Sequence, residues 1–267
     1  MLGAIAGDIA GSVHENFRTK RKDFRLFLPV STFTDDTVLT VAVADALLNG
    51  VDFGRTIRRY AWRRPLRGYG PRFYRWMATP GMEPYNSLGN GSAMRVSAVA
   101  YVAKSEDEVL ELARRSAECT HNHPEGIKGA QAVALAIYLA RMGKSKEEIR
   151  AKLAKDFGYD LDRTINEIRP NYRINLTCPG SVPEALIAFL DSTDFEDALR
   201  NAVSLGGDAD TQAAIAGAVA EAFYGGVPPE IVTRVWRKLP RSYRTVIRRF
   251  HERFPAPTDV EQLLADG

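Results

Sequence analysis

Apolar residues recur along most of the chain with the spacing of amphipathic helices. Ser or Thr followed three residues later by Glu, the pattern of a capping box, predicts helix starts at Ser105, Ser145 and Thr193. Two amphipathic helices are also predicted near the C-terminus, in PPEIVTRVWRKL and SYRTVIRRFHERF. Alternating β-branched segments bounded by hairpin turns are hard to find. The pattern therefore predicts an all-α fold.

Three segments are apolar on almost every side, which is typical of helices buried in the centre of a bundle. They are LGAIAGDIAGS near the N-terminus, VLTVAVADALL after residue 37 and QAAIAGAVAEAF after residue 211. Small residues spaced four apart predict that such helices approach closely, and these are Gly3, Gly7 and Gly11 in the first segment and Ala214, Ala218 and Ala222 in the third. Residues 18–33, 64–92 and about 157–182 are predicted to be irregular and to build a binding site.

The composition is that of a globular protein, and it identifies no binding partner. The 267 residues are 45% hydrophobic and 26% charged, which is ordinary for a globular protein. The net charge of +3, from 36 basic and 33 acidic residues, does not demand a nucleic-acid partner. Cys119 and Cys178 lack CxxC spacing, and no apolar run reaches the ~20 residues of a membrane span. The N-terminus lacks the early positive charge of a signal peptide, so we expect a soluble, cytoplasmic protein with reduced thiols. A monomer is the default expectation.

Two acidic clusters stand at the starts of two of the apolar helices, FTDDT at 33–37 and GGDADT at 206–211. Helix capping explains one Asp or Thr at such a position, and either cluster alone fits capping as well as a metal site. Several carboxylates at the mouths of buried helices would repel one another unless a cation lay between them. Oxygen ligands of this kind suit Mg²⁺, Mn²⁺ or Ca²⁺ rather than zinc. Together, the clusters favour a metal site.

Five motifs, in this order, make the sequence resemble the ADP-ribosylglycohydrolase family. They are GAIAGDIAGSVHE at 3–15, FTDDT at 33–37, NGSAMR at 90–95, HNHP at 121–124 and GGDADT at 206–211. The resemblance implies a single compact all-α domain over residues 1–267, of orthogonal multi-helix type, with a central metal-containing cleft. It also implies two divalent cations, Mg²⁺ or Mn²⁺, held by Thr34, Asp35, Asp36, Asp208, Asp210 and Thr211. Ligands about 170 residues apart must converge on one site, which favours one domain over two.

The implied reaction is hydrolysis at the anomeric carbon of ADP-ribose. Paired metal ions would orient the ribose hydroxyls and lower the pKa of a water, while nearby carboxylates would stabilise oxocarbenium-like charge. We expect Asp35, Asp36 or Glu15 to handle a proton, although Glu15 alone also fits a solvated acid at a helix end. Asp8, one turn inside the first apolar helix, fits a group behind the metal ligands or the buried partner of an arginine, and it is left without a role.

The substrate contacts are read partly from the residues and partly from the resemblance. Asn90, Gly91 and Ser92 form an ordinary turn or a loop whose N–H groups and hydroxyl face phosphate, and the resemblance favours the loop. His121 is implied to contact ADP-ribose, with a structural histidine as the alternative. A zinc site with His123 is disfavoured because no third histidine lies close by in the sequence.

The segment 58–76 interleaves arginines with aromatic residues and is open to three interpretations. It fits a nucleic-acid surface, a solvated helix and loop, or a border of the adenosine pocket formed by Tyr69, Gly70 and Phe73.

The expected function is release of ADP-ribose from an arginine or serine side chain or from another acceptor such as nucleic acid. The alternatives are a hydrolase of free O-acetyl-ADP-ribose or a related nucleotide-sugar, a crystallin-like protein without activity, and a nucleic-acid binder without catalysis. Intact acidic clusters argue against the crystallin-like alternative, because a structural protein gains nothing from close-set carboxylates in its core.

Overall fold

The computed structural model describes residues 1–258, and within them the chain forms helices and no β-strand. An isolated bridge joins Gly89 to Thr177. In chain order the helices are α1 (Leu2–Gly11), α2 (Asp35–Asn49), α3 (Phe53–Arg63), α4 (Pro71–Ala78), α5 (Gly91–Met94), the 3-10 helix η1 (Val96–Ala98), α6 (Val99–Val102), α7 (Glu106–Glu118), α8 (Pro124–Arg141), α9 (Lys146–Phe157), α10 (Ile165–Ile168), α11 (Cys178–Leu190), α12 (Phe195–Val203), α13 (Ala209–Phe223), α14 (Pro229–Lys238) and α15 (Arg241–Arg253). The predicted all-α fold is confirmed.

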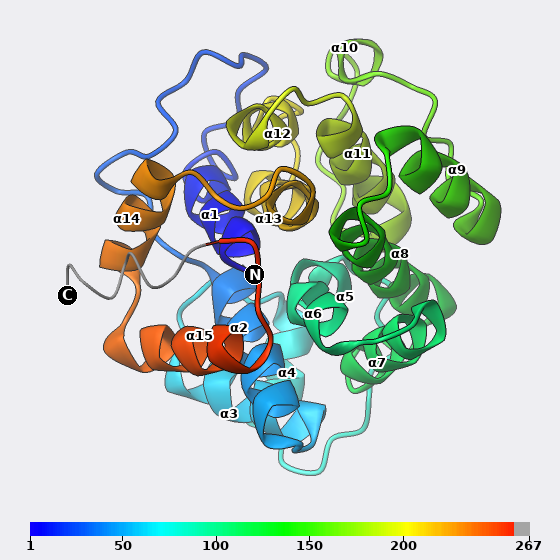
Figure 1. The fold of residues 1–267 in the computed structure, drawn as a ribbon. Coiled ribbons are helices and arrows are strands. Elements are labelled where there is room, and N and C mark those ends of the chain that lie inside the picture. Colours follow the sequence, from blue (N-terminus) through cyan, green and yellow to red (C-terminus); the bar gives the residue numbers. More distant parts are fainter. Residues whose placement is uncertain (259–267) are drawn as a thin grey trace.

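Helices α1, α2 and α13 lie at the centre of the molecule (Figure 1). Every residue of α1 is buried, and so is every residue of α13 except Phe223. These helices are the three segments without a polar face, so the prediction that they form the core is confirmed. Helix α8, which also packs on α13, extends this core.

The glycines of α1 allow its backbone to touch that of α13. A Cβ atom added to Gly7 would lie 2.0 Å from the carbonyl oxygen of Ala213, closer than any real contact. Gly3 and Gly11 face α13 in the same way, and the predicted close approach is confirmed. The carbonyls that the three glycines meet belong to Gly217, Ala213 and Ala209, the row of α13 beside the predicted Ala214, Ala218 and Ala222.

Two of the three predicted capping boxes mark real helix starts. Ser145 and Glu148 form the complete box at α9, whereas at α7 Ser105 accepts from the backbone of Glu108 without the reciprocal bond. The prediction at Thr193 is wrong. Helix α12 begins one residue later because Asp194 accepts a hydrogen bond of 2.8 Å from the backbone N–H of Asp197.

The three segments predicted to be irregular differ in outcome. Residues 18–33 contain no helix. The segment 64–92 contains α4, which starts at a proline, and 157–182 contains α10 and the first turns of α11. Those two helices begin at capping threonines, Thr164 and Thr177, which were missed because the Pro and Gly around them suggested loops.

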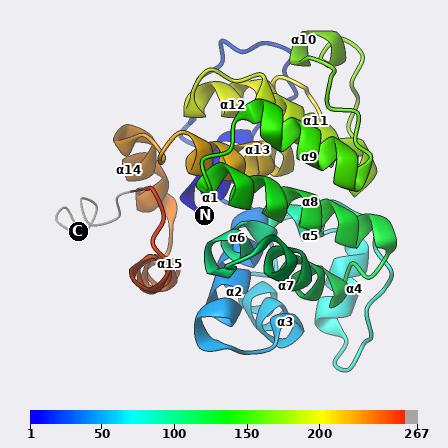
Figure 2. The ribbon, with the colours of Figure 1, turned by 45° about the vertical axis from the view of Figure 1, so that its right-hand side comes forward.

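Outer helices cover the core in two groups (Figure 2). Helices α3 and α15 lie in its lower half, where they pack on α2, and α9 to α12 lie in its upper half, with α1, α8 and α13 between the two groups. The predicted C-terminal helices are α14 and α15, and each buries one apolar face. None of the helices within residues 1–258 is long and apolar enough to cross a membrane. The domain predicted over 1–267 includes nine residues, 259–267, that lie outside the described part.

Candidate active site

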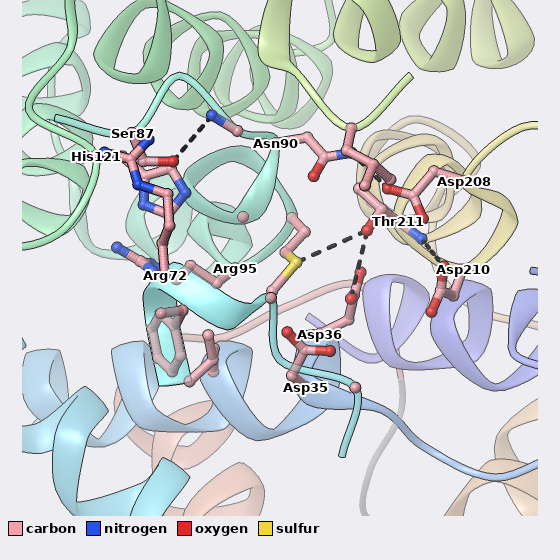
Figure 3. A pocket seen from close by; sticks show the side chains of 18 of the residues that line it. Asp35, Asp36, Arg72, Ser87, Asn90, Arg95, His121, Asp208, Asp210 and Thr211 are labelled. Carbon is pink, nitrogen blue, oxygen red and sulfur yellow. Dashed lines mark hydrogen bonds between the residues drawn. The ribbon is translucent and has the colours of Figure 1, made fainter. Parts of the chain in front are cut away.

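The two acidic clusters lie at one end of the core helices and face a common cleft (Figure 3). The cleft has a volume of about 290 Å³. Thr34 caps α2, so Asp35 and Asp36 occupy its first turn. In the same way Asp208 precedes α13 and Asp210 lies in its first turn. Carboxylates from the starts of both helices therefore meet where the positive ends of the helix dipoles point.

Side-chain contacts link the clusters across the cleft. The hydroxyl group of Thr211, in the second cluster, donates to Asp36 Oδ2 of the first cluster over 3.4 Å. On the other side, Glu15, Asp208 and Asp210 offer oxygen atoms that lie within 4.8 Å of one another. The sequence separates these side chains by almost two hundred residues, and the fold brings them together as predicted.

Asp8 holds the first cluster in place. Its buried carboxylate accepts hydrogen bonds from the backbone N–H groups of Thr34 and Thr37, both over 3.0 Å, and from both threonine hydroxyls. Burial raises the pKa of Asp8 to about 6, against the lowering effect of these bonds. No arginine is among its partners, so of the two roles considered for Asp8 the structure supports the one behind the cluster.

Burial raises the pKa of each acid in the cleft, and repulsion between carboxylates adds to the shift for all of them except Asp208. Burial is the main cause for Asp35, Asp36 and Asp210, and neighbouring carboxylates add to it. The pKa of Glu15 rises through burial and the charge of Asp208. Burial also raises the pKa of Asp208, although a hydrogen bond from Asn90 opposes the shift. A group of buried acids with this repulsion needs a positive partner to stay ionised.

The donor atoms fit a hard divalent cation. All of them are carboxylate or hydroxyl oxygens, the ligands preferred by Mg²⁺ and Mn²⁺. Asp36 Oδ1 is buried and has no hydrogen-bond partner among the described residues. Within residues 1–258, Glu15, Asp208 and Asp210 form the one group of three or more acidic, histidine or cysteine side chains close enough to share an ion. The sequence analysis placed Glu15 with the catalytic groups and not with the ligands.

The loop at residues 90–92 faces the cleft only in part. Asn90 and Gly91 line the cleft, and the Asn90 amide donates to Asp208 Oδ2 over 2.6 Å. Ser92 was expected to turn its hydroxyl towards phosphate, but the side chain is fully buried and donates to the carbonyl of Gly126. The reason is local: Ser92 lies in the first turn of α5, which packs on α8.

His121 lines the opposite side of the cleft and belongs to a short hydrogen-bonded chain. Arg95 donates to the hydroxyl oxygen of Thr120 over 2.9 Å, and that oxygen lies 2.7 Å from His121 Nδ1. A guanidinium group has only donors, so the Thr120 hydroxyl accepts from Arg95 and keeps its own proton available for Nδ1. This arrangement favours the tautomer with the ring proton on Nε2, the atom that lies beside Gly91.

His121 is held neutral by its surroundings. Burial, followed by the positive charges of Arg95 and Arg72, lowers its pKa well below the ordinary value. The other histidine of the motif, His123, accepts from the backbone N–H of Glu125 and caps α8. The two histidines therefore have different hydrogen-bond partners and different structural roles.

Arg95 was not predicted as part of the site. The side chain lines the cleft, is fully buried and forms no ion pair with any described residue. Its Nε and Nη1 atoms have no hydrogen-bond partner there. An isolated charge inside the apolar run AMRVSAVAYV is the signal that would have found it. Arg72 and Tyr85 also line the cleft. Both come from the segment 64–92, which was predicted to be irregular.

Two of the three residues predicted to border the adenosine pocket line the cleft. Gly70 and Phe73 line the cleft, whereas Tyr69 lies behind them. Its ring stacks on that of Phe73 with centroids 5.0 Å apart. Tyr69 therefore supports the cleft wall through its contact with Phe73.

Comparisons with known proteins agree with this geometry. The family model described as ADP-ribosylglycohydrolase matches residues 1–261. ADP-ribosylhydrolase ARH3 of Mus musculus is 29% identical, in an alignment covering 84% of this chain and 82% of the relative. ADP-ribosylarginine hydrolase Tri1 of Pseudomonas putida is 27% identical, covering 99% and 80%. A solved structure described as an ADP-ribosylglycohydrolase-related protein complex aligns with a TM-score of 0.71 at 27% identity, covering 94% of this chain and 95% of that one.

Proposed function

This chain belongs to the ADP-ribosylglycohydrolase family, and on that premise we propose that it is a metal-dependent hydrolase that releases ADP-ribose from a modified acceptor. The observation that carries the proposal is the convergence of carboxylates from the starts of α2 and α13 in one cleft. Relatives named for ADP-ribosyl hydrolysis, with more than four fifths of this chain aligned, support the same reaction.

The proposed metal ligands are Thr34, Asp35, Asp36, Asp208, Asp210 and Thr211, with Glu15 beside them. Mg²⁺ or Mn²⁺ bound there would supply positive charge for the ribose hydroxyls and for a water. The unpartnered Asp36 Oδ1 and the mutual repulsion of the acids support this ligand set.

Each wall of the cleft has a role in the proposed reaction. Asn90, Gly91 and the Nε2–H group of His121 bind the ADP-ribose, and Phe73 borders the base. Water attacks the anomeric carbon as the bond to the acceptor breaks, and Asp35, Asp36 or Glu15 accepts the water proton. The departing atom of the acceptor takes up a proton, which completes the hydrolysis. The carboxylates also stabilise the positive charge that develops on the ribose.

The test is release of free ADP-ribose from ADP-ribosyl-arginine, ADP-ribosyl-serine, O-acetyl-ADP-ribose and ADP-ribosylated nucleic acid. Each reaction is run with Mg²⁺, with Mn²⁺ and with a chelator. We expect turnover that the chelator abolishes and that added cation restores. Activity on O-acetyl-ADP-ribose alone would replace the proposal by a metabolic hydrolase. Binding of ADP-ribose without release from any substrate would identify a binding protein instead.

Thermal unfolding provides a second readout that needs no substrate. A cation at a concentration of about 100 times its dissociation constant stabilises the folded state by roughly 2.7 kcal/mol. In a chain of this size we expect a rise in Tm of about 5–10 °C. An unchanged Tm with Mg²⁺ and Mn²⁺ would count against the metal site.

A further inference from the structure

Basic residues are concentrated in two segments that are far apart in the sequence. Residues 54–76 and 229–253 together hold 16 of the 36 lysines and arginines of the chain, but two of its 33 acidic residues. The rest of the chain therefore holds 20 basic and 31 acidic residues. The small net charge of +3 conceals a strongly positive part and a negative remainder.

One helix from each segment, α3 and α15, lies in the lower part of the molecule beside α2 (Figure 1). Helices α3 and α15 both pack against α2, and the rings of Tyr60 and Tyr243 have centroids 5.9 Å apart. Burial raises the pKa of Tyr243, while the nearby charges of Arg64, Arg67 and Arg63 oppose the shift. Helix α4 packs on α3, and Arg244 and Arg248 of α15 lie over the ring of Trp236 in α14. We call α3, α4, α14 and α15 with the 64–70 loop the basic face.

Most of the charge on this face has no acidic partner among the described residues. Among the described residues, Arg59 is the one member of the sixteen that forms an ion pair, with Asp45. Arg63, Arg237 and Arg241 are exposed, and their side chains form no hydrogen bond with a described residue. Like charges held this close repel one another, so a polyanion that covers them is strongly attracted.

The basic face reaches the mouth of the cleft. Gly68, Gly70 and Arg72, all from the segment 54–76, line the cleft wall. A molecule bound along the face would therefore pass beside the position of the acceptor.

We propose that the basic face binds the sugar-phosphate backbone of nucleic acid and holds a nucleic-acid-linked ADP-ribosyl group at the cleft. Only the second half of this inference rests on the proposed function. Binding of the nucleic acid itself depends on the surface alone.

The chemistry of the face favours nucleic acid over a lipid membrane. Fifteen of the sixteen basic residues are arginines, whose planar guanidinium groups match phosphate with two hydrogen bonds. Trp62 and Tyr74 are 61% and 44% exposed between these arginines, where they can stack on unpaired bases. Membrane-surface helices need a free apolar side, but Tyr243, Ile247 and Phe250 of α15 are buried in the protein.

The first experiment measures binding of a fluorescein-labelled, 20-nucleotide single-stranded DNA by anisotropy across a series of salt concentrations. The test variant combines Arg63→Gln, Arg237→Gln and Arg241→Gln. The matched control combines Lys104→Gln, Arg115→Gln and Lys155→Gln. It removes the same amount of charge from exposed positions outside the basic face. Thermal unfolding of both variants checks that they fold.

We expect the test variant to bind at least about tenfold more weakly at moderate salt and to reduce the salt slope by about 2, since each phosphate contact contributes about 0.7. The control should bind like the wild type, and Trp62→Ala should weaken binding through lost stacking. No binding by the wild type, or equal weakening in the test and control variants, would overturn the proposal. So would binding to phosphatidylserine vesicles in preference to DNA.

A second experiment compares turnover of an ADP-ribosylated oligonucleotide with turnover of ADP-ribosyl-arginine. The test variant should raise KM for the oligonucleotide about tenfold, with kcat and the small substrate unaffected. An equal KM for both proteins would overturn the link between the face and the cleft. Salt-sensitive DNA binding without release of ADP-ribose from any compound would instead contradict the proposed function and leave the binding face standing.

Discussion

The two sides of the cleft carry opposite charges and are built in different ways (Figure 3). On one side, carboxylates such as Asp36, Asp208 and Asp210 gather at the starts of core helices and repel one another. On the other side Arg72 and Arg95 flank a neutral histidine, His121. No ion pair of the described residues joins the two sides. Each side therefore keeps an unbalanced charge that a ligand can meet, cations and ribose on the first and an anionic group on the second.

The difference shows which part of the site depends on something from outside the chain. Buried carboxylates without a counter-ion cost free energy, so the acidic side is complete only with a cation bound. The basic side is already ordered by its own hydrogen bonds through Thr120. We expect substitutions on the acidic side to remove activity, and those on the basic side to weaken binding.

The largest effect is expected from Asp36→Asn and from Asp210→Asn. Either change removes a proposed ligand charge, so turnover should fall by a factor of about 10³ or more, equivalent to roughly 4 kcal/mol. Without metal, the variants should be at least as stable as the wild type because one repelling charge is gone. Release of ADP-ribose and thermal unfolding with and without Mn²⁺ check both points.

The control for these variants is Asp162→Asn, whose carboxylate is 92% exposed. It should keep both wild-type turnover and the rise in Tm with Mn²⁺. Normal turnover in both cleft variants would show that these acids hold no essential cation.

The second prediction concerns the close contact between helices that carries the acidic side. Gly7→Ala would place a methyl group 2.0 Å from the carbonyl oxygen of Ala213 and force α1 away from α13. Although alanine normally favours a helix over glycine, overpacking here should destabilise the fold by about 3 kcal/mol. Denaturant unfolding measures the change.

Gly70→Ala is the matched control for that stability measurement. Gly70 has an ordinary extended backbone, with φ −61° and ψ 151°, and open space around the missing Cβ. Its substitution should change the free energy of unfolding by less than about 0.5 kcal/mol. Equal stability of the two variants would mean that α1 and α13 do not need their close approach.

The two sides of the cleft also differed in how well the sequence predicted them. The acidic side was readable because its residues stand next to one another at helix starts, so short motifs contain it. Asp8 is a single charge inside the apolar helix α1, and Arg95 is a single charge between α5 and η1 in an apolar stretch. Their partners lie on other elements that no local pattern identifies. The same limit explains Thr193 and Ser92: their hydrogen bonds depend on a neighbouring aspartate and on the packing of α5 against α8.

The third prediction tests the hydrogen-bonded chain on the basic side. Thr120→Val keeps the shape of the side chain but removes the donor to His121 Nδ1, so the Nε2–H form is no longer enforced. Affinity for ADP-ribose should fall by about tenfold, the value of roughly one hydrogen bond. Ring ¹⁵N chemical shifts should show a mixture of tautomers in this variant, and Thr120→Ser should restore the single Nε2–H form. A single tautomer in all three proteins would refute the chain.

The smallest effect is expected at Arg72, because its charge contributes less to the low pKa of His121 than burial or the charge of Arg95. The groups that face this ring are Arg95, Arg72 and Tyr85, and burial is the main reason for its low pKa. Because the folded-state pKa of His121 lies below the unfolded value of about 6.5, the unfolded chain takes up a proton first as the pH falls. The ring thus contributes its full stability above pH 6.5 and progressively less below it.

In NMR titrations the wild-type ring should stay neutral from pH 8 to pH 5. Arg72→Gln removes one positive neighbour and should raise the pKa of His121 slightly, whereas Arg115→Gln should leave it unchanged. A wild-type ring that titrates near pH 6.5 would show that neither burial nor the two arginines control it, and the contrast between the two sides of the cleft would then rest on the carboxylates alone.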